Sequence, residues 1–156
     1  MGIIKKTIND HIEDEPYQFT SCNDQIDKLI GTHFTCLDMS GAYEQLVVKP
    51  KCRPLLTLNT PYGFLQPNRM KYGVKTAPKI FQQNVGGVIQ GMDGKGPVPR
   101  TACVVDDICT TGSTPQEHFD NLVELLSRLH AAGLKLNKDK CKFYQIEVQF
   151  SGKIID

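Results

Sequence analysis

The sequence lacks the long apolar stretches that would place the chain in a membrane or direct it to secretion. No run of about 18 apolar residues is present, which excludes a transmembrane helix. The first six residues contain no apolar signal-peptide stretch, and Lys6 stands where N-myristoylation requires Ser or Thr. We therefore expect an intracellular protein, cytoplasmic or nuclear, that is not secreted and has no membrane partner.

The sequence also lacks the cysteine and histidine spacing of a metal site or a disulfide framework. Its six cysteines include no Cys-x-x-Cys pair, and its four histidines have no metal-ligand spacing. Zinc and structural disulfides are not expected, whereas free thiols in a reducing compartment are. Internal repeats and low-complexity segments are absent, so the 156 residues are expected to form one domain.

The net charge is only +1, but the charge is unevenly distributed along the chain. Six acidic residues lie within the first 27 positions, whereas from residue 28 onward 16 Lys and Arg face 11 Asp and Glu. The densest basic run covers residues 135–142. This run is interpreted either as a solvated loop face or as an edge that faces nucleic-acid phosphates.

Helix and strand patterns alternate along the chain. The clearest helix begins at the capping box formed by Thr114 and Glu117 and ends at Gly133. Other patterns predict helices over 21–30 and 76–90, and strands over 34–39, 55–60, 64–70, 102–105, 108–111, 134–136 and 148–155. We expect an α+β fold in which an antiparallel sheet carries helices packed on one face.

Two adjacent acidic residues, Asp106 and Asp107, lie between two β-type runs. Val104 and Val105 precede them, and Ile108 follows. Side-by-side carboxylates repel each other, and a bound divalent cation would relieve that repulsion. Asp is also common in turns because it hydrogen-bonds its own backbone, so the pair alone leaves both interpretations open.

A third acidic residue, Asp38, follows the apolar residues Cys36 and Leu37 near the end of a predicted strand. If that strand lies beside the acidic hairpin, three carboxylates converge at one edge of the sheet. Such a group suits two Mg²⁺ ions about 3.5–4 Å apart, the arrangement used for in-line phosphoryl displacement. Mg²⁺ favours a few protein carboxylates together with substrate phosphates over a complete protein cage.

Five ordered segments resemble the motifs of reverse transcriptases. They cover residues 37–46, 56–63 with 68–82, 104–108, 133–141 and 148–152. Their order and spacing are similar to those of Gypsy-type LTR retrotransposon and retrovirus-like enzymes. The resemblance implies a polymerase palm: a single domain fragment, with residues 1–32 as a lead-in with partial fingers, residues 33–156 as the palm, and no thumb.

The resemblance also implies an activity and its partners. An RNA-directed DNA polymerase extends a DNA primer on an RNA or DNA template, and it uses dNTPs and two Mg²⁺ ions, with Mn²⁺ as an alternative. The thumb, ribonuclease H and integrase domains of a parent polyprotein are expected but do not occur in this chain.

By the same resemblance, individual residues take on roles. The implied metal ligands are Asp38, Asp106 and Asp107, and Lys140 neutralises the pyrophosphate leaving group. The implied nucleotide-binding residues are Met39, Ser40, Tyr43, Tyr72, Gly73 and Lys5. The implied primer grip consists of Phe150, Ser151 and Gly152. Tyr43 would block a ribose 2′-OH with its ring; by its type alone it is equally an aromatic residue of the core.

Several positions depart from the family pattern. Val104 replaces the Tyr of the Tyr-x-Asp-Asp box, Lys71 replaces a Pro, and Ser151 replaces an apolar residue. These departures and the missing thumb leave two alternatives to a working polymerase. One is a degenerate or domesticated, catalytically inactive palm fragment that binds nucleic acid or protein. The other is a fragment with no role of its own.

Overall fold

The computed structural model describes residues 9–12, 22–91 and 94–156, and these form two compact units. The larger unit contains residues 22–40 and 82–156, and the smaller contains residues 41–81 with the described N-terminal residues. Helix α3, Ala77–Gln90, runs from the smaller unit into the larger. None of the described helices combines the length and apolar character needed to cross a membrane. The assignment of residues 1–32 and 33–156 to fingers and palm stays a prediction.

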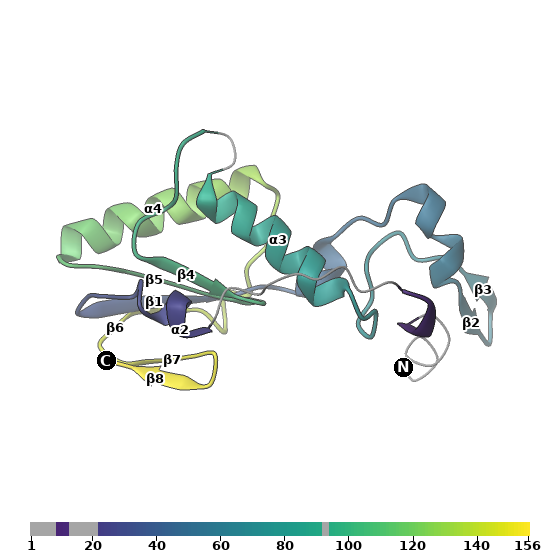
Figure 1. Cartoon of the computed structure of the whole chain (residues 1–156), viewed down its shortest axis with the longest axis horizontal. Helices are drawn as coiled ribbons and strands as arrows, with labels where there is room; N and C mark the ends of the chain where they lie inside the picture. Colours follow the sequence, from purple (N-terminus) through teal and green to yellow (C-terminus); the bar gives the residue numbers. More distant parts are fainter. Residues whose placement is uncertain (1–8, 13–21, 92–93) are drawn as a thin grey trace. The chain divides into compact units, whose positions relative to one another are not determined.

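A four-stranded antiparallel sheet lies at the centre of the larger unit, in the order β4-β5-β1-β6 (Figure 1). Its strands are β1 (His33–Asp38), β4 (Thr101–Val104), β5 (Asp107–Gly112) and β6 (Lys142–Gln145). Strands β1 and β5 pair without interruption, from His33 opposite Gly112 to Asp38 opposite Asp107. Because side chains alternate between the two faces of a sheet, this register decides which of them lie together.

The long helix α4, Pro115–Ala131, packs on one face of the sheet beside α3 (Figure 1). The hydroxyl of Thr114 accepts the backbone N–H of Glu117 at 3.1 Å, and the Glu117 carboxylate accepts the N–H of Ser113 at 2.7 Å. Gly112 lies so close beneath the helix that a Cβ there would overlap the backbone of its first turn. The predicted helix and its Thr114 cap are confirmed, whereas the return bond of the capping box goes to Ser113, one residue before the N-cap.

The opposite face of the sheet is covered by a short helix and a hairpin. These elements are α2 (Cys22–Ile26), β7 (Val148–Phe150) and β8 (Lys153–Ile155). One buried cluster joins them to the sheet; its members are Leu29, Phe34, Ala102, Cys109, Val148, Phe150 and Ile155. Thr35 points to the other face, where its hydroxyl lies 2.9 Å from Nε2 of His118 in α4.

Three predicted elements of the larger unit differ from the structure. The helix expected over 21–30 ends at Ile26. The strand expected over 148–155 is a hairpin, because Ser151 and Gly152 adopt positive φ values of 49° and 79° and reverse the chain. Residues 134–136 form only one bridge, between Leu136 and Met39, and β6 was not predicted because its four residues are all exposed.

The smaller unit consists of short 3₁₀ helices and one hairpin. Its elements are η1 (Asn9–His11), η2 (Ala42–Gln45), η3 (Pro50–Cys52), η4 (Pro54–Leu56), β2 (Leu58–Thr60) and β3 (Gly63–Leu65). A small buried cluster contains Val48, Leu56, Val74 and Ala77. The strands expected over 55–60 and 64–70 are shorter than predicted, because Pro54 begins a 3₁₀ turn and Pro67 has no N–H for the strand ladder.

Candidate active site

Three acidic residues of the larger unit lie at or next to one end of β1 and β5. Asp38 is the last residue of β1, and Asp107, the first residue of β5, lies directly opposite it. Opposite residues of an antiparallel pair point to the same face, with Cα atoms about 4.5–5.5 Å apart. Asp106 lies one residue earlier, in the turn that joins β4 to β5. The expectation that the two strands lie side by side is confirmed.

The turn that joins β4 to β5 is strained. Val105 has a φ of 57°, in the left-handed region that a β-branched side chain disfavours. Val104 pairs with Asp107, so Val105 and Asp106 form a two-residue hairpin turn. Such a turn with positive φ at its first central residue favours Gly there. A non-Gly residue held in a sparsely populated backbone region costs of order 1–3 kcal/mol, and such strain is common at functional sites.

The carboxylate of Asp107 is electrostatically disfavoured in its charged form. Partial burial and the negative charges of Asp106 and Asp38 raise the pKa of Asp107 above the ordinary value of 3.8. The backbone N–H of Ser151 donates a hydrogen bond to this carboxylate and opposes the rise in pKa without cancelling it. The negative charges of Asp106 and Asp38 therefore both reach the carboxylate of Asp107.

The hydrogen bond from Ser151 links the β7–β8 hairpin to the acidic pair, which is formed by the opposed residues Asp38 and Asp107. Phe150 is buried in the core on the same side of the sheet, and this contact holds the hairpin against β1 and β5. The turn formed by Ser151 and Gly152 is thereby placed at the carboxylate of Asp107. These are the residues expected to form the primer grip, and that role stays a prediction.

The basic segment after α4 is bonded to the end of β1. The N–H of Asn137 donates to the carbonyl of Asp38 at 2.8 Å, and the N–H of Ser40 donates to the carbonyl of Lys135 at 3.0 Å. Met39 is buried between these two bonds. A triphosphate that binds the Ser40 amide, as expected, would have to replace the bond to Lys135. Lys140 is exposed in the following turn, beside the strand that ends in Asp38.

The side chains do not form a closed metal cage. In the residues that the structure describes, no three His, Cys, Asp or Glu side chains are grouped so that they could hold one metal ion. Asp38 and Asp107 oppose each other across the strands, whereas Asp106 lies in the turn. Of the three residues whose carboxylates were expected to converge, two are directly opposed, and the third, Asp106, is the chain neighbour of Asp107.

The smaller unit holds the remaining residues that were expected to bind nucleotide. The ring of Tyr43 packs against Tyr72 and Phe81, with centroids 4.9 Å and 5.7 Å apart. Tyr43 is partly buried against the small core cluster, so it has the packing role that its residue type allowed. Gly73 has a φ of 98°, and its carbonyl accepts a hydrogen bond from Asn9 at 2.8 Å. Lys5 lies outside the described residues.

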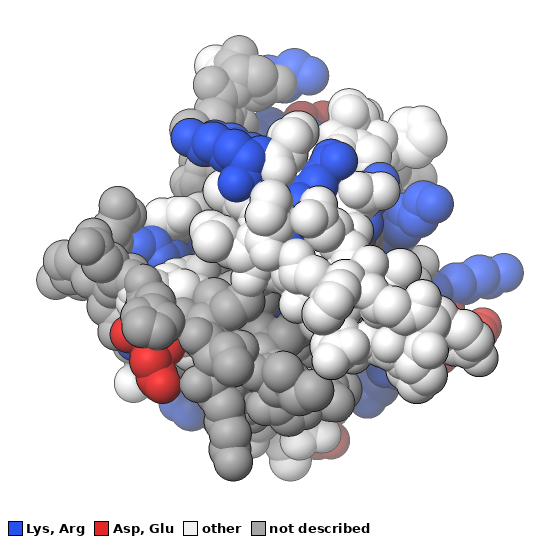
Figure 2. Space-filling view, turned by 90° about the vertical axis from the view of Figure 1, so that its right-hand side faces the viewer, with Lys and Arg blue, Asp and Glu red and all other residues white. Residues whose placement is uncertain are grey.

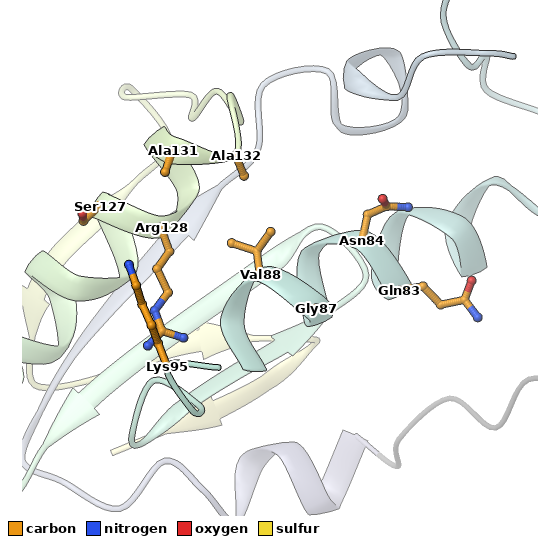
Figure 3. A pocket seen from close by; sticks show the side chains of 9 residues that line it. All are labelled: Gln83, Asn84, Gly87, Val88, Lys95, Ser127, Arg128, Ala131 and Ala132. Carbon is orange, nitrogen blue, oxygen red and sulfur yellow. The ribbon is translucent and has the colours of Figure 1, made fainter. Parts of the chain in front are cut away.

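A cavity of about 530 Å³ lies between α3, the following loop and α4 (Figure 3). The buried Arg128 reaches across it: one guanidinium nitrogen donates to the carbonyls of Ile89 and Gly96, at 3.2 Å and 2.7 Å. Its Nε bonds to Glu124 at 2.7 Å. This cation holds the loop against both helices, a structural role that the sequence patterns did not reveal. No residue of the acidic pair lines the cavity.

Solved structures share this fold. A foamy viral protease-reverse transcriptase in complex with double-stranded DNA matches with a TM-score of 0.84 and 19% identity, over 95% of this chain and 25% of that chain. A crystal structure of the prototype foamy virus protease-reverse transcriptase matches with a TM-score of 0.82 and 20% identity, over 94% and 19% of the two chains. At this level of identity the matches establish the fold, and they confirm the predicted α+β polymerase palm.

The sequence comparisons establish the family. The family model for reverse transcriptase (RNA-dependent DNA polymerase) matches residues 2–155. The chain therefore belongs to the reverse transcriptase family, and the predicted resemblance is confirmed. Among its curated relatives are an uncharacterized protein of Caenorhabditis elegans, 30% identical over 145 residues, and the transposon Tf2-3 polyprotein of Schizosaccharomyces pombe, 29% identical over 153 residues. The alignments cover 93% and 97% of this chain, which spans 11% of the length of each relative.

Proposed function

We propose that this chain carries the nucleotidyl-transfer centre of an RNA-directed DNA polymerase, which joins a dNTP to a primer 3′-OH on an RNA or DNA template. One observation carries the proposal: Asp38 and Asp107 oppose each other across β1 and β5, with Asp106 next to them. Burial and the charges of Asp38 and Asp106 raise the pKa of Asp107, so this arrangement of carboxylates brings no structural benefit of its own. Their placement is explained if positive charge joins them during the reaction.

The donor set fits Mg²⁺. Carboxylate oxygens are the hard ligands that Mg²⁺ prefers, and Mg²⁺ commonly takes only one or two of them, with substrate phosphates and water completing its coordination. Asp38, Asp106 and Asp107 would hold the two ions. When bound, the ions would lower the pKa of the attacking hydroxyl and stabilise the charge on the leaving group. In the part of the chain that the structure describes, no closed cage surrounds one point, so substrate oxygens would have to complete the coordination of the ions.

The other residues would position the substrates. The turn at Ser151 and Gly152, hydrogen-bonded to Asp107, would hold the primer end at the acidic pair. Lys140 is exposed on a turn beside β1, and its mobile ammonium would neutralise the departing pyrophosphate as a point charge. Tyr43 would exclude a ribose 2′-OH through its ring, with Tyr72 and Gly73 lining the same nucleotide pocket. Met39, Ser40 and Lys5 would contact the triphosphate, and Phe150 would support the primer grip from the core.

Primer extension tests this proposal directly. The purified chain is incubated with an oligo(dT) primer on poly(rA), dTTP and Mg²⁺, and product length is followed on a gel. We expect extension by the native chain and none by Asp107→Asn, because removing one carboxylate charge weakens the site for the divalent ion. Asp139→Asn is the matched control, since Asp139 is an exposed turn residue outside the acidic pair.

A second measurement separates loss of chemistry from loss of folding. Mg²⁺ is expected to raise the melting temperature of the native chain and of Asp139→Asn, and to raise that of Asp107→Asn less. A native chain that neither extends primer nor is stabilised by Mg²⁺ would contradict the proposal. Extension that persists in Asp107→Asn would contradict it as well.

A second candidate function, nucleic-acid binding without catalysis, is favoured by the charge of residues 41–81, the main segment of the smaller unit. Residues 41–81 contain seven Lys and Arg and one Glu. Figure 2, which faces the end that carries β2 and β3, shows Lys and Arg side chains over much of its upper part and right side, with others at the left and below. Such a surface binds phosphates in a salt-dependent way. Binding of labelled primer-template that weakens steeply with salt, without any extension, would support this function over the polymerase.

A further inference from the structure

Two cysteines face each other across β1 and β5, directly behind the acidic pair. Cys36 is paired with Cys109 in the strand register, two positions from the pair formed by Asp38 and Asp107. Opposite residues of antiparallel strands have Cα atoms about 4.5–5.5 Å apart, and disulfides span about 4.4–6.8 Å. The two thiols already share a hydrogen bond, and both are free. The geometry thus allows a bond between them without a shift of the strands.

The environments of the two thiols differ. Cys36 is partly exposed, whereas Cys109 is fully buried in the core cluster beneath the β7–β8 hairpin. Cys36 is therefore the thiol that an external reagent reaches first, and Cys109 is the thiol directly opposite it.

We propose that Cys36 and Cys109 form a reversible disulfide, a redox modification site that is independent of the proposed polymerase activity. The oxidant is a small disulfide such as oxidised glutathione. The Cys36 thiolate attacks one of its sulfur atoms, forms a mixed disulfide and releases one glutathione thiolate, which takes up the proton that Cys36 lost. The Cys109 thiol then loses its proton, attacks the sulfur of Cys36 and releases the second glutathione as its thiol. Two protein thiols are oxidised, and one glutathione disulfide is reduced to two thiols.

The other described cysteines are less suited to this reaction. Cys103 lies on the opposite face of β4, and burial with the nearby acidic residues raises its pKa to about 12. Cys141 has its sulfur 4.0 Å from the carbonyl of Asp38 and is not paired with another cysteine in the strand register. Cys52 belongs to the smaller unit. The Cys36–Cys109 pair is thus the only directly opposed pair of cysteines in the described strands.

Peptide mapping tests the proposal on the full chain. The folded protein is treated with oxidised glutathione, remaining thiols are blocked with N-ethylmaleimide, and a digest is analysed by mass spectrometry without reduction. We expect one dominant cross-linked peptide, Cys36 to Cys109, that disappears on treatment with dithiothreitol. Cys36→Ser should abolish it, and Cys52→Ser, the matched control, should leave it unchanged.

Three outcomes would decide against the proposal. A stable mixed disulfide at Cys36 in the native chain, without the cross-link, would mean that Cys109 does not resolve it. A dominant cross-link from Cys36 to a different cysteine, or no oxidation of Cys36 under conditions that oxidise Cys52, would also overturn the proposal. In Cys109→Ala we expect glutathione to remain on Cys36. If that variant does not fold by circular dichroism, the map of the native chain alone decides.

Discussion

Replacing Asp107 by Asn should stabilise the folded chain when no divalent metal is present. Asp107 lies directly opposite Asp38, and like charges in this arrangement cost about 0.2–1 kcal/mol. Asp106 adds a second repulsion from the turn. The N–H of Ser151 favours the charged form, but the raised pKa of Asp107 shows that burial and repulsion outweigh it. Because the site is partly exposed, solvent screening reduces the effect, and we expect a gain of about 0.5–1 kcal/mol.

The gain in stability from Asp107→Asn should decrease as the pH falls. The folded state binds a proton at Asp107 more readily than the unfolded state does, because the pKa is raised on folding. The difference between Asp107→Asn and the native chain is therefore present in full at neutral pH. It should shrink as the pH falls through the raised pKa and vanish below the ordinary value of 3.8.

Chemical unfolding in urea measures this difference. Native chain, Asp107→Asn and the control Asp139→Asn are compared at low ionic strength with EDTA, at neutral and acidic pH. In a parallel thermal unfolding experiment, the same gain should appear as a rise in melting temperature of roughly 1–4 °C for a chain of this length. The reasoning is refuted if Asp107→Asn is less stable than the native chain at neutral pH, or no more stable than Asp139→Asn.

Substitutions at four other positions have expected effects on the free energy of unfolding. Gly86→Ala should stabilise α3 by about 1 kcal/mol, since a Cβ there meets open space. Gly112→Ala should cost about 1–3 kcal/mol, because its Cβ would overlap the backbone of α4. Thermal denaturation should therefore give a higher melting temperature than that of the native chain for Gly86→Ala and a lower one for Gly112→Ala. Thr114→Ala should cost about 1 kcal/mol through loss of the helix cap, and Thr114→Ser should retain most of the stability in urea titration. Val105→Gly should stabilise the turn by about 1 kcal/mol in calorimetry.

Features with strong local signals could be predicted from the sequence. The capping box at Thr114 and Glu117 specifies the start of α4 through bonds between neighbouring residues. The acidic hairpin was also predictable, because β-branched residues flank Asp106 and Asp107 on both sides. Asp38 was also a candidate from the sequence, because it follows the apolar residues Cys36 and Leu37, and the strand pairing places it opposite Asp107.

Features that depend on distant contacts could not be predicted. The four residues of β6 are all exposed and show no alternation of buried and exposed positions, so the pairing of β6 with β1 is visible only in the fold. The bond from Ser151 to Asp107 joins residues more than 40 positions apart, and no local pattern encodes it. The Ser151–Gly152 turn did have a signal in the Ser-Gly dipeptide, but the apolar residues on both sides made the segment read as one strand.

The uninterrupted register between β1 and β5 makes the length of β1 as important as its composition. One residue inserted between Phe34 and Asp38 would rotate Asp38 to the face that α4 covers, while Asp107 stayed on the other. Two inserted residues would restore the face but shift Asp38 by about 6.8 Å along the strand, away from its partner. A substitution in this stretch leaves the register of the two strands intact, whereas any insertion or deletion separates the two carboxylates.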